Sequence, residues 1–154
     1  MNIAALKERN NLDQHTAEAR FYTQLAELLQ QLRLRTLPTS VTEKINTHIS
    51  VLNSSDCDGS NLKKLVKKQQ AEILKLIEKE LKIVPKNYYR NLWLALGISA
   101  FGLPLGVAFG LSIGNMGLMA LGLPIGMAIG VAVGTNMDKK ALEQGRQLDI
   151  EIKY

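Results

Sequence analysis

The sequence predicts an all-α protein: a small cytoplasmic helical domain is followed by a transmembrane helical hairpin, and the hairpins assemble into an oligomer. Three observations predict this fold class. Asn91–Met137 contains no Asp, Glu, Lys or Arg and holds every glycine except Gly59 and Gly145. Within that stretch a pattern of fifteen residues occurs twice, at an offset of twenty. The residues before it show amphipathic helical patterns that are separated by breaks.

The uncharged stretch is long enough for two membrane crossings. A helix rises ~1.5 Å per residue, so ~20 apolar residues span the hydrocarbon core of a bilayer. Asn91–Ile113 and Gly117–Thr135 each meet this length, and the link Gly114–Gly117 between them is short and turn-forming. A buried core in a soluble protein is the alternative, which the length of the uncharged stretch disfavours. We therefore predict a two-helix hairpin over residues 87–137.

Glycine recurs at every fourth position in both copies of the repeat, Ala100–Gly114 and Ala120–Gly134, of which eight aligned positions are identical. In a bilayer, apolar burial does not drive helices together, and small residues at this spacing let backbones approach closely instead. We therefore predict that these glycines form the helix-packing and oligomerisation surface. The residues are Gly102, Gly106, Gly110, Gly114, Gly122, Gly126, Gly130 and Gly134.

Small and large residues also alternate along both copies, because Pro, Ala or Ser stands midway between successive glycines. On a helix this places two rows of small residues on opposite sides. One row can pack inside the hairpin and the other against a neighbour, so we expect a homo-oligomer, and a closed ring is one form of it. Alternation is also typical of a strand. Pro104 and Pro124 disfavour a membrane β-hairpin, and in helices they predict kinks near residues 100 and 120.

Basic residues flank both ends of the hairpin, whereas the link has none. By the positive-inside rule both termini are expected to be cytoplasmic, with the hairpin in the cell (inner) membrane. Aromatic and basic side chains near the ends are expected to anchor the hairpin at the lipid headgroups. The expected anchors are Tyr88, Tyr89, Arg90, Trp93, Lys139 and Lys140.

The predicted cytoplasmic domain covers residues 1–86, with helices at about 2–35, 40–52 and 61–84, and a cytoplasmic tail follows at residues 138–154. Each predicted helix carries apolar residues at spacings of three and four. Ser40 and Glu43 have the spacing of a capping box at the start of the second helix. The tail is expected to continue the second membrane helix by a turn or two, ending near Gly145.

The third predicted helix is rich in lysine. Its face is expected to be solvated and drawn to anionic lipid headgroups. An anionic ligand such as a nucleotide or nucleic acid, and an acidic cytoplasmic protein partner, are the alternatives. Lys63, Lys64, Lys67 and Lys68 are the candidate anion contacts. Since no nucleophile motif, phosphate-binding loop, metal cluster or dinucleotide fingerprint occurs, we expect neither an enzyme nor a cofactor.

At its glycine runs the sequence resembles glycine-zipper, two-helix membrane proteins of bacteria, and it is similar to small hairpins that form rings, such as the rotor subunit of ATP synthases. The rotor needs a mid-membrane carboxylate, which this stretch lacks. The general plan is also similar to bacterial membrane effectors of anti-phage systems. We therefore expect a homo-oligomeric pore, channel or membrane-perturbing assembly that the cytoplasmic domain controls. A non-conducting anchor that holds a cytoplasmic partner is the alternative.

Overall fold

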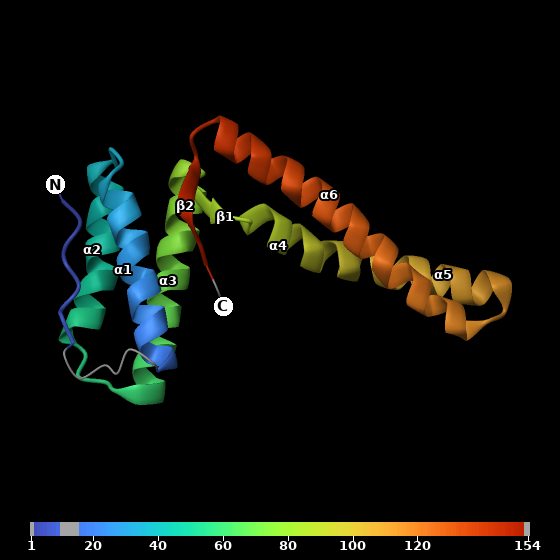
Figure 1. The fold of residues 1–154 in the computed structure, drawn as a ribbon, viewed down its shortest axis with the longest axis horizontal. Coiled ribbons are helices and arrows are strands. Elements are labelled where there is room, and N and C mark those ends of the chain that lie inside the picture. The colour runs from blue at the N-terminus through green and yellow to red at the C-terminus, as the bar shows by residue number, and fades with distance from the viewer. Residues whose placement is uncertain (1, 10–15, 153–154) are drawn as a thin grey trace. The chain divides into compact units, whose positions relative to one another are not determined.

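A computed structural model describes residues 2–9 and 16–152, except for the side chains of Met116 and Leu118. The described chain is mostly helical, as the sequence predicts (Figure 1). It divides into two compact units. The helical domain consists of Met1–Val84 with Leu148–Tyr154, and the hairpin is Pro85–Gln147. The predicted division had three parts, with residues 138–154 as a separate tail. In the structure the first part of this tail belongs to the hairpin and the rest to the helical domain.

Three helices build the helical domain: α1 (Ala17–Arg33), α2 (Thr39–Ser54) and α3 (Gly59–Leu81). Both α1 and α2 pack against α3. Each helix buries a stripe of Leu, Ile or Val at helical spacing, because only one side of each helix faces the other two. Leu28, Ile45 and Ile73 are fully buried members of the three stripes. The domain therefore has a hydrophobic core of its own.

The first helix is shorter than predicted. Residues 2–9 are not helical, and α1 begins after Thr16, whose hydroxyl accepts a hydrogen bond from the Ala19 N–H at 3.3 Å. Residues 2–9 bond to side chains of α2 instead of forming their own helical ladder. The prediction of one helix over residues 2–35 was therefore wrong in its first part, since contacts with another element outweigh local helix propensity.

Two further local predictions need correction. The capping box is absent, because α2 begins one residue before Ser40 and its N-cap, Pro38, makes no side-chain bond. The third helix ends early, since Lys82 adopts a left-handed conformation with φ 56° that closes α3. Strand β1 (Val84–Lys86) follows and pairs with β2 (Gln147–Glu151) in a two-stranded sheet that the sequence analysis missed.

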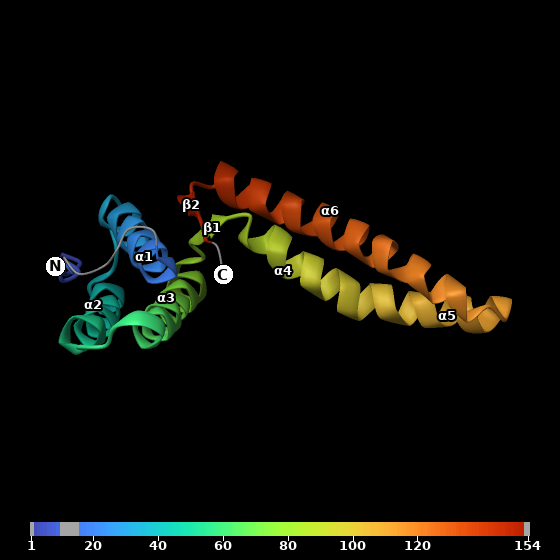
Figure 2. The ribbon, with the colours of Figure 1, turned by 60° about the horizontal axis from the view of Figure 1, so that its bottom comes forward.

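The hairpin consists of two helical segments that run antiparallel (Figures 1 and 2). The first contains α4 (Tyr88–Leu96), a π-helical turn (Gly97–Gly102) and α5 (Leu103–Ile113). The second contains a 3₁₀ segment (Met116–Leu121) and α6 (Gly122–Glu143). Both copies of the repeat are helical, so the strand alternative was wrong. The chain departs from α-helical geometry just before each of the two repeat prolines, close to the predicted kinks.

By length and composition, two helical segments of the hairpin could cross a membrane: Tyr88–Ile113 and Met119–Glu143. The prediction gave the narrower spans Asn91–Ile113 and Gly117–Thr135. The structure adds a turn before the first span and two turns after the second, where α6 continues through Lys139 and Lys140. This extension of α6 into the tail agrees with the predicted end near Gly145.

Candidate functional site: a glycine-packed hairpin with an apolar outer face

Glycines let the two segments of the hairpin touch backbone to backbone. A methyl group placed on Gly126 would lie 2.5 Å from the backbone nitrogen of Gly102 and 2.6 Å from its Cα. A methyl group on Gly134 would lie 2.5 Å from the Cα of Arg90. Real Cβ atoms do not approach backbone atoms so closely, and these backbones have no room to move apart while the helices stay packed. The close approach therefore requires glycine.

The contacts run along most of the hairpin. Gly134 and Gly130 face α4, Gly126 faces the π-helical turn, and Gly122 lies beside Gly102 and Gly106. Gly110 is buried on α5 as well. Six of the predicted packing glycines thus meet across the hairpin of a single chain: Gly102, Gly106, Gly122, Gly126, Gly130 and Gly134.

Gly114 lies outside this seam. It is exposed, has φ +68° and ends α5, and a methyl group on it would meet nothing within 4 Å. This left-handed conformation favours glycine at the end of a helix. Gly114 therefore serves the turn and not the packing face of the hairpin.

A glycine that the prediction did not include extends the seam toward α4. Gly97 is buried, and a methyl group on it would lie 2.8 Å from the Cα of Gly130. Gly97 precedes Gly102 by five residues instead of four, which would turn the two away from each other on an α-helix. The π-helical turn spans these two glycines and keeps both on the packing face.

Asp138 is a second member of the seam that sequence reasoning missed. It is buried, with 7% of its surface exposed, and its carboxylate oxygens accept the backbone N–H groups of Tyr89 at 3.0 Å and Arg90 at 2.9 Å. These donors lie in the first turn of α4, where no helical acceptor exists. A signal was present in the sequence, because Asp138 continues the four-residue spacing of the glycines one step beyond Gly134.

The outer face of the hairpin is apolar and exposed. Among described residues, every exposed large hydrophobic side chain except Leu34 and Val51 belongs to the hairpin. Large exposed apolar surfaces are typical of proteins that contact a membrane or another protein. These side chains are Leu92, Leu96, Phe101, Leu103, Val107, Phe109, Leu111, Ile113, Leu121, Leu123, Ile125, Met127, Ile129, Val133 and Leu142.

The second row of small residues lies on this outer face. Pro104 and Ala108 on α5, and Pro124 and Ala128 on α6, are all exposed. The row continues through Ser112 and Ala132, which are exposed too. Each segment therefore presents a shallow stripe between its larger apolar side chains.

The predicted membrane-interface anchors gather at one end of the hairpin, because Asp138 joins the start of α4 to α6. The rings of Tyr88 and Tyr89 meet edge to face with centroids 5.2 Å apart, and Trp93 is half-buried one turn further along α4. On α6, the Lys139 ammonium lies 4.0 Å from the Glu143 carboxylate. The other predicted anchors at this end, Arg90 and Lys140, are exposed.

In the helical domain, two of the four candidate anion-binding lysines lie against an aromatic ring and two are exposed. The Lys67 and Lys63 ammonium groups lie 4.4 Å and 5.5 Å from the centre of the Phe21 ring, which attracts cations through its π face. Lys64 and Lys68 are exposed. Two of the lysines thus pack on α1, and two are left on the surface for an anion.

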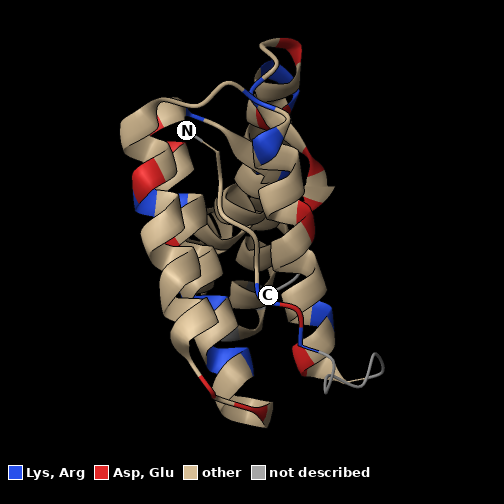
Figure 3. Ribbon diagram, turned by 90° about the vertical axis from the view of Figure 1, so that its left-hand side faces the viewer, with Lys and Arg blue, Asp and Glu red and all other residues tan. Residues whose placement is uncertain are grey.

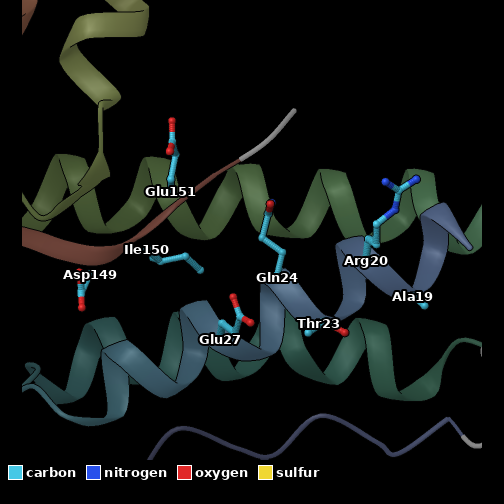
Figure 4. A pocket seen from close by; sticks show the side chains of 8 residues that line it. All are labelled: Ala19, Arg20, Thr23, Gln24, Glu27, Asp149, Ile150 and Glu151. Carbon is cyan, nitrogen blue, oxygen red and sulfur yellow. The ribbon is translucent and has the colours of Figure 1, made fainter. Parts of the chain in front are cut away.

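An open pocket of about 810 Å³ lies between α1 and β2. Gln24 and Glu27 point from α1 toward β2, and Ile150 points from β2 toward α1 (Figure 4). Arg20 is the one basic residue among its lining residues, with Glu27 and the C-terminal acidic residues Asp149 and Glu151.

The part of the chain that the structure describes contains no group of three or more His, Cys, Asp or Glu residues placed to hold a metal ion. His48 bonds to Gln69, with 2.7 Å between its Nδ1 and the Gln69 Oε1, in a partly buried position. Comparisons of the chain with protein-family models, with curated proteins and with solved structures find no match.

Proposed function

We propose that this protein is an integral membrane protein whose hairpins self-associate into a pore, channel or membrane-perturbing assembly under the control of the helical domain. The apolar outer face of the hairpin supports this proposal most strongly. Only 22% of the most apolar window in each candidate span is buried, whereas the core helix of a soluble protein is mostly buried. A surface of this kind has to be covered, and lipid covers it at the lowest cost.

A pore would lie between hairpins, because the inside of each hairpin is closed by packing. The glycine seam brings the two backbones into contact, so it leaves no passage for water or ions within a chain. Self-association would use the outer row of small residues, including Ala108 and Ala128, which fits close helix packing in lipid. This assigns the oligomer contact to the opposite side of each helix from the buried glycines.

The few polar side chains on the hairpin would give such a pore a nearly apolar lining. Ser99, Ser112, Asn115, Thr135 and Asn136 are exposed on it. A passage with so few polar groups conducts only when it is wide enough to hold water. A change in the helical domain that widens the ring would open it, and the exposed lysines on α3 offer one place for an anionic trigger to act.

The same scarcity of polar groups favours a second candidate function. A non-conducting membrane anchor needs only the apolar outer face and the packed seam, and its helical domain would hold a partner. The proposed orientation, with both termini in the cytoplasm, is common to both candidates.

Efflux from vesicles separates the two. The full chain, reconstituted into sealed vesicles of phosphatidylethanolamine and phosphatidylglycerol, is expected to release a trapped dye. An Ala128→Leu variant is the matched control, because it fills the outer row and leaves the seam intact. It should lower both release and the mass of the particle. If wild-type oligomers release no dye, the pore is excluded and the non-conducting anchor remains.

A further inference from the structure

The N-terminal segment, residues 2–9, lies on the face formed by α1 and α2 and is bound there through its backbone (Figure 3). The side-chain amide of Asn46 makes two of these bonds. Its Oδ1 accepts the Ala4 N–H at 2.8 Å, and its Nδ2 donates to the Asn2 carbonyl at 3.2 Å. One amide thus pairs with a donor and an acceptor two residues apart, as a neighbouring β-strand would.

Asn53 repeats the arrangement about two turns further along α2. Its Oδ1 accepts the Lys7 N–H at 2.8 Å, and its Nδ2 donates to the Ala5 carbonyl at 2.9 Å. The two asparagines therefore bind three-residue stretches of extended chain in succession. Because they contact only backbone groups, their bonds do not depend on the side chains of the bound segment.

Helix α1 supports the segment from the other side. The Tyr22 hydroxyl donates to the Lys7 carbonyl at 2.6 Å, and Arg33 Nη2 donates to the Ala4 carbonyl at 2.7 Å. The backbone of residues 2–9 is thus held by side chains of two helices that also build the core. These bonds define a docking groove for an extended peptide between α1 and α2.

Every third side chain of the segment faces the domain. Ile3 is buried, with 8% of its surface exposed, and Leu6 packs against the same core. Arg9 reaches the end of α2, where its guanidinium donates to three backbone carbonyls in and just beyond the last turn of the helix. They belong to Leu52 at 3.2 Å, Ser55 at 2.6 Å and Cys57 at 2.9 Å.

The groove therefore recognises an extended Ile-x-x-Leu-x-x-Arg pattern. Arginine suits the last position, because its charge meets the negative end of the α2 dipole and its planar group reaches several acceptors at once. The Asp58 carboxylate, 3.9 Å from the Arg9 guanidinium, adds opposite charge at the same place.

We propose that, in the assembled protein, this groove binds the N-terminal segment of a second copy of the chain. The segment makes the same contacts whether it comes from its own chain or from a neighbour, which is the condition for exchange of an element between copies. Residues 10–15 join it to α1, and six residues can span up to ~20 Å. The inference rests on the proposed self-association, which would raise the effective concentration of a neighbouring groove.

Two full-chain variants test the exchange. The segment variant, Ile3→Asp with Arg9→Ala, has an intact groove and a segment that cannot dock. The groove variant, Asn46→Ala with Asn53→Ala, has an intact segment and no receptor. A dye is attached to the groove variant at Glu8→Cys, with Cys57→Ser so that the label is unique. Glu8 and Cys57 are both exposed.

Exchange predicts that the dye tumbles freely in the groove variant alone and becomes immobilised when the segment variant is added in the same micelles. Its fluorescence anisotropy should rise and saturate at one segment per groove. Adding an unlabelled groove variant is the matched control and should change nothing, because it brings copies without receptors.

A free peptide of residues 1–9 shows whether the groove accepts the segment at all, and particle mass shows whether copies associate. Peptide binding without any anisotropy rise in an oligomer would overturn the exchange and leave the proposed assembly standing. A monomeric particle would overturn both. If the peptide does not bind the segment variant, the groove is no receptor and the inference fails.

Discussion

At the scale of single residues, Asp138 shows how one carboxylate can fix the end of a helical hairpin. Helix α4 begins after Asn87, which has φ 59° and makes no side-chain cap bond to the helix. The acceptor that this helix start needs comes from α6 instead, where both oxygens of Asp138 receive a backbone N–H. A negative charge at the positive end of α4 is favourable in addition.

Replacing Asp138 by Ala should therefore destabilise the hairpin. Two partly buried backbone donors lose their acceptor. A fully buried unpaired donor costs about 1–3 kcal/mol, and partial burial places these two toward the lower end. Asp138→Asn keeps one acceptor oxygen and should lose less. The free energy of unfolding in mixed micelles measures the effect, and Lys140→Ala, at an exposed site on the same helix, is the control. Equal stability of the Ala variant and the control would show that α4 does not depend on this cap.

The sequence also shows why such a residue is missed. Asp138 directly follows the uncharged stretch, so charge alone assigned it to the tail. Its four-residue spacing from Gly134 would have placed it on the packing face of the helix. Such a spacing identifies a helix face but not the group to which the carboxylate bonds. The partner depends on where α4 begins, and a left-handed Asn87 gives only a weak sequence signal for a helix start.

At the scale of elements, the hairpin is held by shape along a seam of glycines, whereas the helical domain is held by a core of large apolar side chains. The loss of stability on adding one methyl group should therefore differ from glycine to glycine along the seam. At Gly102 the nearest atom to an added methyl is the Gly122 carbonyl oxygen at 3.2 Å, a distance that a small shift can relieve. At Gly126 the nearest atoms lie much closer and are all backbone.

Gly126→Ala should therefore destabilise the hairpin by more than Gly102→Ala. Overpacking typically costs about 1–3 kcal/mol, and rigid backbone on the opposite helix places Gly126 toward the upper end. Val133→Ile, which enlarges an exposed side chain of the same helix outside the outer row of small residues, is the matched control. Thermal unfolding followed by helical circular dichroism gives the order, and a Gly102 variant less stable than the Gly126 variant would contradict the seam.

The π-helical turn determines how the hairpin should respond to the deletion of one residue. Deleting Ser99 shortens the spacing between Gly97 and the next glycine to four, which an α-helix accommodates without rotating the rest of the seam. This variant should stay folded. Deleting Val107 also removes one residue, but it reduces the Gly106–Gly110 spacing to three and turns the far part of α5 away from α6. Helical content and melting temperature should fall only in the second case.

Two alternating stretches show what period-two patterns can and cannot predict. In Gln147–Glu151, apolar side chains alternate with polar ones, and this segment is a strand with Leu148 and Ile150 buried. In the repeat, small residues alternate with large ones, and the segment is a helix with two smooth sides. Alternation of polarity predicts a strand, whereas alternation of size serves helix packing. The strand over Gln147–Glu151 was not predicted.

At the scale of the whole molecule, the helical content and the two apolar segments follow from composition and spacing. The extended course of residues 2–9 does not, because it depends on asparagines more than forty residues away in the sequence. Nor does the return of β2 to the helical domain, where Leu148, Ile150 and Ile152 join the core. Both depend on contacts between distant segments, which a local pattern does not contain.

The connectivity of the units gives the last prediction, on membrane topology. The helical domain is covalently joined to both ends of the hairpin, and Asp138 holds those ends together. If the hairpin crosses the bilayer twice, the helical domain must lie on one side and the Asn115 turn on the other. The flanking basic residues favour the cytoplasm for the domain.

Cysteine labelling in intact cells tests this arrangement, since Cys57 is the only cysteine of the chain and is exposed. An impermeant maleimide should label Cys57 only after the membrane is permeabilised. In a Cys57→Ser, Asn115→Cys variant, the turn should be labelled from outside without permeabilisation. A turn that also needs permeabilisation would mean that the hairpin does not cross, because two crossings leave the link and the domain on opposite sides whatever the oligomer.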